Sequence, residues 1–368
     1  GDRPFVVIFL TDGRPTVGIT GEGQIVQNVS KAAGNTRVFC FGIGTDVNAH
    51  LLDKITEETR ASSTYVTPQE DIEVKVSSFY TKIKEPVLAN PQLEFSDGIR
   101  VTKLYPNPLP DLFRGEELVL VGRYKGKGDS DVLLEGTLAG KKTQLEFPVT
   151  FPAQADHDFI PRLWATRRVG YLLDEIRLRG ENKELKDEVT TLARKYGIVT
   201  PYTAYLIIED EQRRGVPVAQ RTLRNFEADR EVLEQTRKQF EALKLDKAGD
   251  QAIGSARAAK ALKEATNAKA AANNSNREAQ QANFGFANSA PKVPTDSGLS
   301  GKASQLFFAD TKSDSARAVS QPMEFAAGKN FTQNAQFWVD SDVQAAELAK
   351  AKRSRIAFNS DAYFNLLA

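Results

Sequence analysis

The run Phe5-Val6-Val7-Ile8-Phe9-Leu10-Thr11-Asp12-Gly13 decides the fold of this 368-residue chain. Its first six residues are apolar and mostly β-branched or aromatic, a pattern typical of a strand and too short for an ordinary helix. An apolar run without polar alternation indicates a strand buried on both faces, as in parallel sheets that helices cover. The run ends at Thr11-Asp12-Gly13, so Asp12 is predicted at the carboxyl end of a central strand.

Asp12 has two interpretations at this position. Open α/β sheets bind ligands beside the carboxyl ends of their strands, and a carboxylate there is a natural ligand for a hard cation. Alternatively, Asp12 bonds its own backbone in the turn before Gly13. The local pattern leaves both interpretations open.

Strand and helix patterns alternate along residues 1–85. Two more strands are predicted at Thr36–Ile43 and Ser63–Thr67, and helices at Gly21–Ala33, Asn48–Arg60 and Asp71–Ile83. This alternation indicates a parallel sheet with right-handed crossovers. Three strands are few for a free-standing sheet of this kind, and the chain opens at Gly1 without an initiator Met. We therefore expect further strands upstream, in a longer protein.

The composition excludes several classes of function. Lys and Arg number 49 against 48 for Asp and Glu, so no general attraction to nucleic acid or anionic membranes follows. The single cysteine, Cys40, excludes an internal disulfide, and its apolar neighbours predict a buried, unreactive thiol. His50 and His157 are too few for most histidine-based metal sites. No apolar segment approaches the roughly 20 residues of a membrane helix.

Residues 86–154 predict a small antiparallel β-sandwich. Prolines and Gly-containing turns separate short alternating runs at Gln92–Phe95, Ile99–Leu104, Glu117–Tyr124, Asp131–Leu138 and Lys142–Phe151. Four basic side chains on these runs suggest an anion site, but alternation places polar residues on a solvated outer face in any case. These are Arg100, Lys103, Arg123 and Lys125. We favour the solvated face.

Residues 155–210 predict a helical hairpin followed by a strand at Thr203–Ile208. Trp164 and Tyr171 lie on one apolar stripe, which indicates core packing. The charged residues Asp174, Glu175, Arg177 and Arg179 crowd one turn. Paired charges at helical spacing are usually an exposed salt-bridged face, and we prefer this interpretation to an acid/base cluster.

The remaining sequence divides at about residue 325. Residues 211–325 predict an amphipathic helix at 221–245 and then a low-complexity linker, because 252–283 are Ala-rich with almost no large apolar side chains. Residues 326–368 predict a small α+β element that contains a hairpin of Lys329–Phe331 and Gln336–Asp340 and a helix at 343–352. Asp340 and Asp342 lack the further oxygens that a cation site needs.

Several stretches resemble known proteins. Phe9–Gly13, Val38–Asn48 and Leu51–Ile55 resemble the second half of a von Willebrand factor A domain. Tyr105–Leu118 is similar to inter-alpha-trypsin inhibitor heavy chains and their bacterial relatives. Three further stretches resemble bacterial proteins that join a vault/inter-alpha-trypsin domain to an A domain, namely Phe159–Ala165, Gly170–Arg177 and Ala193–Thr203.

The resemblance implies an α/β fold whose first unit, 1–85, is the C-terminal half of a Rossmann-like A-domain sheet. In that family the Asp of the Thr-Asp-Gly turn belongs to a metal-ion-dependent adhesion site. Its partners are an Asp-x-Ser-x-Ser loop and a Thr from the first half of the domain. The chain contains no Asp-x-Ser-x-Ser, so only Asp12 carries over. We expect Mg²⁺ or another divalent cation in the complete protein and none in this fragment.

The resemblance also implies a function. It predicts a non-enzymatic adhesion module, exported or in the cell envelope, that binds an acidic group of a protein partner through the cation. One alternative is a structural scaffold with a degenerate A domain and no metal, and a more remote one is a metal-assisted hydrolase. The sequence shows no nucleophile elbow, His-Glu-x-x-His motif or phosphate loop. It also offers no evident site for a small-molecule substrate or a nucleic acid.

Overall fold

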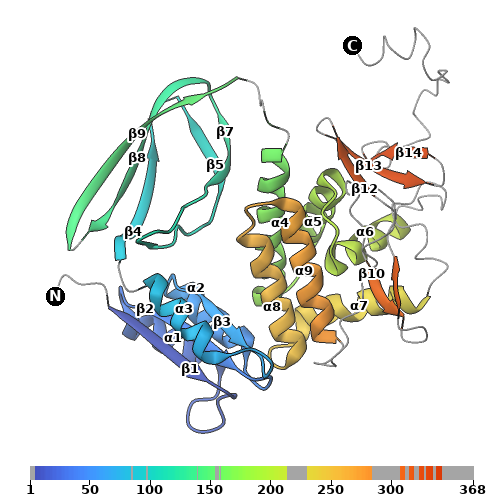
Figure 1. Cartoon of the computed structure of the whole chain (residues 1–368), viewed down its shortest axis with the longest axis horizontal. Coiled ribbons are helices and arrows are strands. Elements are labelled where there is room, and N and C mark those ends of the chain that lie inside the picture. Colours follow the sequence, from blue (N-terminus) through green and yellow to red (C-terminus); the bar gives the residue numbers. More distant parts are fainter. Residues whose placement is uncertain are drawn as a thin grey trace.

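The computed structural model describes residues 5–83, 86–96, 98–138, 140–153, 157, 159–213, 230–283, 307–310, 315–318, 323–326, 329–334 and 337–341. Figure 1 shows three large groups of elements in chain order, followed by short strands near the C-terminal end. They are named here the sheet unit (5–83), the β-sandwich (86–153) and the helical block (159–283).

The sheet unit is a three-stranded parallel sheet with three helices. The strands are β1 (Val6–Thr11), β2 (Arg37–Ile43) and β3 (Ser63–Val66), in the order β1-β2-β3, and the helices are α1 (Glu22–Ala33), α2 (Ala49–Glu58) and α3 (Ile72–Ile83). Phe79 of α3 packs edge-on against Phe39 and Phe41 of β2. Cys40 points to the other face, into a core with Leu52 of α2. The predicted α/β class is confirmed.

Burial within the sheet differs from the prediction. β1 lies at the edge of the sheet in the described residues, and Val7, Ile8, Phe9 and Leu10 are each 36–47% exposed. The expectation that this run is buried on both faces is therefore wrong. β2 is the buried central strand, because it has a neighbouring strand on each side and helices over both faces. An apolar run predicts a strand correctly, but it does not predict how many neighbouring strands and helices cover that strand.

The β-sandwich contains only antiparallel pairings. One sheet has the order β6-β4-β8-β9, and β5 pairs with β7 to form the other. The strands are β4 (Pro86–Phe95), β5 (Arg100–Tyr105), β6 (Leu112–Phe113), β7 (Val121–Lys125), β8 (Gly128–Leu138) and β9 (Lys141–Phe151). Tyr124 of β7 contacts the ring of Phe151 of β9, so the two sheets face each other.

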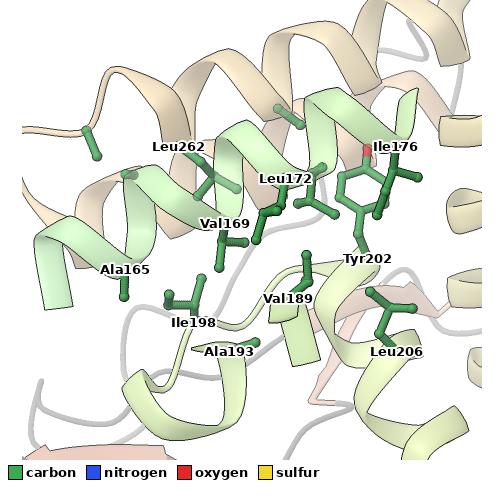
Figure 2. Close-up of a cluster of buried hydrophobic side chains, with 14 of the residues drawn as sticks. Ala165, Val169, Leu172, Ile176, Val189, Ala193, Ile198, Tyr202, Leu206 and Leu262 are labelled. Carbon is green, nitrogen blue, oxygen red and sulfur yellow. The ribbon is translucent and has the colours of Figure 1, made fainter. Parts of the chain in front are cut away.

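The helical block holds the largest core. Its helices are α4 (Phe159–Arg179), α5 (Lys183–Tyr196), α6 (Pro201–Arg213), α7 (Arg230–Leu245), α8 (Asp250–Lys263) and α9 (Ala268–Asn283). Figure 2 shows α4 side chains such as Leu172 and Ile176 packed between Tyr202 of α6 and Leu262 of α8. Trp164 belongs to this core, as the apolar stripe predicted.

The predicted strand Thr203–Ile208 is wrong, because this segment lies within α6. The β-branched and aromatic residues favoured a strand, but the local start signal favours a helix. Pro201 occupies the first turn, where a missing N–H costs nothing. Thr200 and Thr203 exchange hydrogen bonds, with Thr203 Oγ1 accepting from Thr200 N at 2.8 Å and Thr200 Oγ1 accepting from Thr203 N at 3.2 Å. This reciprocal capping fixes the helix start.

The prediction that residues 252–283 belong to a low-complexity linker is also wrong. They form most of α8 and all of α9, and Ala258, Ala259 and Leu262 are almost fully buried. Small side chains let two helices approach closely, so backbone and Cβ atoms supply the buried surface that large side chains supply elsewhere. Gly170 of α4 marks this contact, because a Cβ added there would lie 2.6 Å from the backbone N of Lys263.

The described C-terminal strands confirm the predicted hairpin. β13 (Lys329–Asn334) pairs antiparallel with β14 (Phe337–Asp340) and with β12 (Met323–Ala326), while β10 (Phe307–Asp310) pairs with β11 (Ser315–Ala318). Asn330 Nδ2 donates to the carbonyl of Arg194 at 2.8 Å, which seats the hairpin on α5. The predicted helix at 343–352 and Asp342 lie outside the described residues.

We predict that Gly170→Ala separates α4 from α8 and lowers the free energy of unfolding by about 1–3 kcal/mol, the usual cost of overpacking. Urea unfolding monitored by circular dichroism measures this change. Gly23→Ala is the matched control, because Gly23 lies on α1 and a Cβ there meets nothing within 4 Å. The control should be neutral or stabilising by up to about 1 kcal/mol. Equal effects of the two variants would contradict the close contact.

Candidate functional site

Asp12 lies at the carboxyl edge of the sheet, as the sequence predicts. It follows β1 directly, and its side chain is exposed. The turn after β1 is held by Thr11, whose Oγ1 accepts a hydrogen bond from Gly13 N at 3.4 Å. A hydroxyl therefore fills the role that the turn interpretation gave to the Asp12 carboxylate. Among the described residues, Asp12 itself makes no hydrogen bond to the turn, and its carboxylate faces solvent.

Two loops and the start of α8 border this edge. Arg14 Nε donates to the backbone carbonyl of Asp46 at 3.3 Å, which joins the loop after β1 to the loop after β2. Asp250, in the first turn of α8, lies near Asp46. Burial raises the pKa of Asp250, and the Asp46 carboxylate adds to the effect.

The described residues do not by themselves fit a magnesium ion. Mg²⁺ requires near-octahedral oxygen ligands from several groups. No cluster of three or more His, Cys, Asp or Glu side chains with metal-binding geometry occurs in the described part of the chain. A cation bound at Asp12 would therefore need further ligands from outside the described residues.

Gly42 and Cys40, both on β2, serve packing. A Cβ on Gly42 would lie 2.9 Å from the ring of Tyr65 and 3.0 Å from Val47, so the glycine makes room for side chains of its own sheet unit. Cys40 is fully buried, and burial together with Asp53 raises the pKa of its thiol to about 12. The prediction of a buried, unreactive thiol agrees with this environment.

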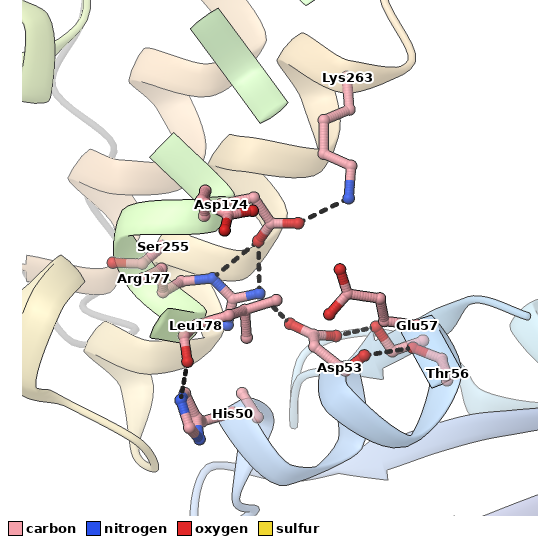
Figure 3. Close-up of polar contacts among 12 residues, drawn as sticks. His50, Asp53, Thr56, Glu57, Asp174, Arg177, Leu178, Ser255 and Lys263 are labelled. Carbon is pink, nitrogen blue, oxygen red and sulfur yellow. Dashed lines mark hydrogen bonds and ion pairs between the residues drawn. The ribbon is translucent and has the colours of Figure 1, made fainter. Parts of the chain in front are cut away.

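The most extensive polar cluster joins the sheet unit to the helical block (Figure 3). Arg177 of α4 donates from Nη2 to Asp53 Oδ2 of α2 at 2.5 Å and to Asp174 Oδ1 at 2.7 Å. Lys263 of α8 donates to Asp174 Oδ2 at 2.6 Å. The hydroxyls of Tyr65 and Ser63 donate to Asp53 Oδ1. We call these residues the junction network.

The charges of the junction network stabilise one another. Burial alone would raise the pKa of Asp174, but the cations of Lys263 and Arg177 outweigh it and hold that pKa well below its ordinary value. Asp53 and Asp174 likewise raise the pKa of Arg177 despite its burial. Two carboxylates facing two cations balance the buried charge. Groups fixed in their charged forms in this way are poorly suited to proton transfer at neutral pH.

The sequence prediction for this turn is correct for one ion pair and wrong for the other. Arg179 and Glu175 do form an exposed pair at 3.1 Å. Arg177 is instead buried and Asp174 is mostly covered, which corrects the prediction that the whole cluster lies on an exposed face. Helical spacing predicted the pair at positions i and i+3, but it gives no sign of Asp53, which is 124 residues away.

A second buried ion pair joins the sheet unit to the β-sandwich. Arg37, at the start of β2, donates from Nε and Nη2 to the two oxygens of Asp111 at 2.8 and 2.9 Å. Its Nη2 also donates to Asn90 Oδ1 at 2.6 Å. Such a bidentate contact fixes the orientation of both partners.

The basic strand residues have partners of their own. Lys103 forms an ion pair with Glu188 of α5 at 2.6 Å, and the Arg123 guanidinium lies 5.4 Å from the ring of Trp164. These contacts argue against an anion site at Lys103 and Arg123, and they direct both side chains to the helical block instead of to a purely solvated face. Among the described helices, none combines the length and the apolar character needed to cross a membrane.

No family model matches the chain. Curated relatives do match it, among them several inter-alpha-trypsin inhibitor heavy chains. Heavy chain H4 of Homo sapiens is 26% identical over 243 residues, which are 62% of this chain and 26% of the relative. Heavy chain H4 of Bos taurus is 29% identical over 231 residues, 59% of this chain and 25% of the relative. This similarity agrees with a von Willebrand factor A-like domain, and the chain spans about a quarter of these relatives.

Two solved structures show weaker likeness. A von Willebrand factor type A protein from Catenulispora acidiphila gives a TM-score of 0.32 at 15% identity and covers 58% of this chain and 57% of its own. The ArnB paralog VWA2 from Sulfolobus acidocaldarius gives 0.30 at 15% identity, over 70% and 64%. Scores in this range do not establish a common fold.

We predict that Asp53→Asn lowers the free energy of unfolding by about 3–5 kcal/mol, because it leaves the Arg177 cation buried without its interdomain partner. The control is Glu175→Gln, which removes an exposed ion pair worth about 0–1 kcal/mol. Urea unfolding of both variants measures the difference. A loss below 1 kcal/mol for Asp53→Asn would contradict the role assigned to the junction network.

The environment of Glu70 predicts a contribution to the free energy of unfolding that is lost in acid. Burial raises its pKa, but hydrogen bonds from Thr67 and the Arg257 cation outweigh burial and lower that pKa to about 2. A carboxyl with a depressed folded pKa stabilises above its unfolded value near 4.5 and loses this contribution as the pH falls toward 2. Glu70→Gln should therefore be less stable than the wild type at pH 6, and most of this difference should be lost at pH 2. A difference in urea titrations that is as large at pH 2 as at pH 6 would contradict this assignment.

Proposed function

We propose that the chain forms part of a non-enzymatic protein-binding module that meets its partner at the carboxyl edge of the sheet unit. The observation that carries the proposal is the exposed Asp12 carboxylate, placed at this edge while Thr11 holds the turn. The similarity to inter-alpha-trypsin inhibitor heavy chains supports it, since that similarity covers more than half of the chain.

The finer part of the proposal concerns a divalent cation. Asp12 would supply one oxygen ligand to Mg²⁺, and polypeptide beyond the residues described here would supply the others. An open coordination position would then accept an acidic group of the protein partner. The exposed apolar side chains of β1 support this view, because a further strand beside β1 would cover them and bring new loops to the same edge.

The location of the protein is part of the same proposal. We propose an extracytoplasmic or cell-envelope setting, in a protein of the bacterial type that joins a vault/inter-alpha-trypsin domain to an A domain. The support is the resemblance in the helical block together with the similarity to the heavy chains.

A structural scaffold without a cation is the second candidate. The observation that favours it is the presence of two sets of buried charged side chains, the junction network and the Arg37–Asp111 pair. Both fix the arrangement of the units. A metal-assisted hydrolase is more remote, because Asp12 is its only support in the described residues.

We predict that the protein from the complete reading frame binds Mg²⁺ saturably by calorimetry and that Asp12→Ala abolishes this binding without lowering thermal stability. Glu58→Ala, an exposed carboxylate on α2, is the control and should bind as the wild type does. The 368-residue chain alone should give no saturable heat below millimolar Mg²⁺.

Two results would reject the proposal. No Mg²⁺ response in the complete protein would leave the scaffold. Hydrolytic turnover that disappears in Asp12→Ala would instead favour the enzyme.

A further inference from the structure

Strand β9 is the outer strand of the four-stranded sheet in the β-sandwich. It pairs with β8 from Lys141 to Phe151, and no other described strand pairs with its second side. Figure 1 shows β8 and β9 as a long hairpin on the side of the β-sandwich that lies away from the helical block. A long strand with a free edge is a template for pairing with another strand.

The backbone of β8 shows which groups of β9 face the free edge. Asp131 of β8 directs its backbone toward β4, because its N–H donates to Ser96 Oγ at 3.0 Å and its carbonyl accepts from Ser96 N at 3.2 Å. In an antiparallel strand the N–H and C=O groups of one residue point to the same side. Pro148, which lies opposite Asp131, therefore has its backbone on the free edge, where its missing N–H removes no bond to β8.

Three residues before Pro148 share this orientation. Because the register with β8 is unbroken, the N–H and C=O groups of Lys142, Gln144 and Glu146 also face the free edge. Their side chains lie on the outer face of the sheet and are exposed. Within the described part of the chain, Lys142 and Glu146 form no ion pair. Both the backbone and the charges of this segment are therefore available to a partner.

The inner face of β9 is apolar and incompletely covered. Leu145, Phe147 and Val149 alternate along the strand, and they are 45%, 46% and 38% exposed. The facing sheet consists of two strands, β5 and β7, against four in the sheet that contains β9. A further strand beside β9 would cover part of these apolar side chains as well as the free backbone groups.

The order of charges on β9 suits a second copy of the same strand. A two-fold axis through Gln144 sets Lys142 opposite Glu146 of the partner subunit, and the symmetry repeats this pair. The residues that face each other all have backbone groups on the free edge, so they can exchange hydrogen bonds. Opposite charges on facing residues stabilise antiparallel strands. An axis through Thr143 or Leu145 would lose both ion pairs, and an axis through Glu146 would set two carboxylates face to face.

We propose that two copies of this chain associate through β9, antiparallel and centred on Gln144, so that their four-stranded sheets join into one continuous sheet. A two-fold contact of this kind uses the same surface on both subunits, so assembly stops at a dimer. Pro148 lies beyond the matched charges and ends the pairing, because it cannot donate a hydrogen bond to the partner strand. The dimer does not involve Asp12 and is independent of the proposed function.

Sedimentation velocity of the 368-residue chain over a concentration series tests the dimer. Lys142→Glu should raise the dissociation constant at least about tenfold, because two pairs of opposite charges become two pairs of like charges. The double variant Lys142→Glu/Glu146→Lys restores both pairs with reversed sign and should dimerise again. Lys127→Glu is the control, since it makes the same charge change in the exposed turn between β7 and β8.

Three outcomes would overturn the proposal. A wild-type chain that stays monomeric throughout the series would leave the free edge to a strand of another protein. Dimerisation of Lys142→Glu as strong as that of the wild type would place the contact on another surface. A double variant that dimerises no better than Lys142→Glu would exclude the pairing of Lys142 with Glu146.

Crosslinking tests the register without changing any charge. Gln144→Cys places the two thiols on directly opposed residues, whose Cα atoms are about 5.5 Å apart in a hydrogen-bonded pair. Thr150→Cys, on the same face of β9, places them about 40 Å apart. A short bis-maleimide should therefore join the subunits of Gln144→Cys and leave Thr150→Cys unjoined on a denaturing gel. The native Cys40 is fully buried and should not react. Equal crosslinking of the two variants would overturn the proposed register.

Discussion

The burial of Arg177 between Asp53 and Asp174 constrains the arrangement of the whole molecule. A guanidinium removed from water needs its full set of acceptors, because an unpaired buried charge costs several kcal/mol. One acceptor lies on its own helix, and the other lies on α2 of the sheet unit. The charge is therefore satisfied only when the two units meet in one orientation. The network acts through specificity of docking more than through net stabilisation, because desolvation offsets much of the Coulomb attraction.

Helix α8 extends this constraint to a third element. Three of its basic side chains donate hydrogen bonds to other elements. Lys263 donates to the Asp174 carboxylate, Lys260 to the Ser63 carbonyl of β3, and Arg257 to the Glu70 carboxylate. These long side chains leave from the same helix whose alanines pack closely against α4. Small residues set the distance between the helices and basic residues set their register. A segment with almost no large apolar side chains thereby becomes a central part of the structure.

The sequence predicted features that depend on neighbouring residues, and it missed contacts between residues far apart in the chain. Alternating strand and helix patterns located the sheet unit, and the end of an apolar run placed Asp12 at the carboxyl edge. Periodicity could not show that β1 lies at an edge, since exposure depends on neighbours and not on the strand itself. It also misjudged α8, because hydrophobic patterns weigh large side chains and overlook close backbone contact. The strand predicted in α6 failed for a different reason, since the capping signal of Thr200 and Thr203 was present but outweighed by β-branched composition. No local pattern could connect Asp53 to Arg177.

Two aspartates of the sheet unit show why burial matters more than residue type. Asp53 accepts hydrogen bonds from Arg177, Tyr65 and Ser63, so its carboxylate is occupied by contacts within the fold. Asp12 is exposed at the end of β1, and the turn beside it relies on Thr11. Fold stability therefore places few demands on Asp12, and its carboxylate stays available to a ligand. An exposed aspartate at the edge where parallel sheets bind their ligands is the observation on which our proposal of a binding module rests.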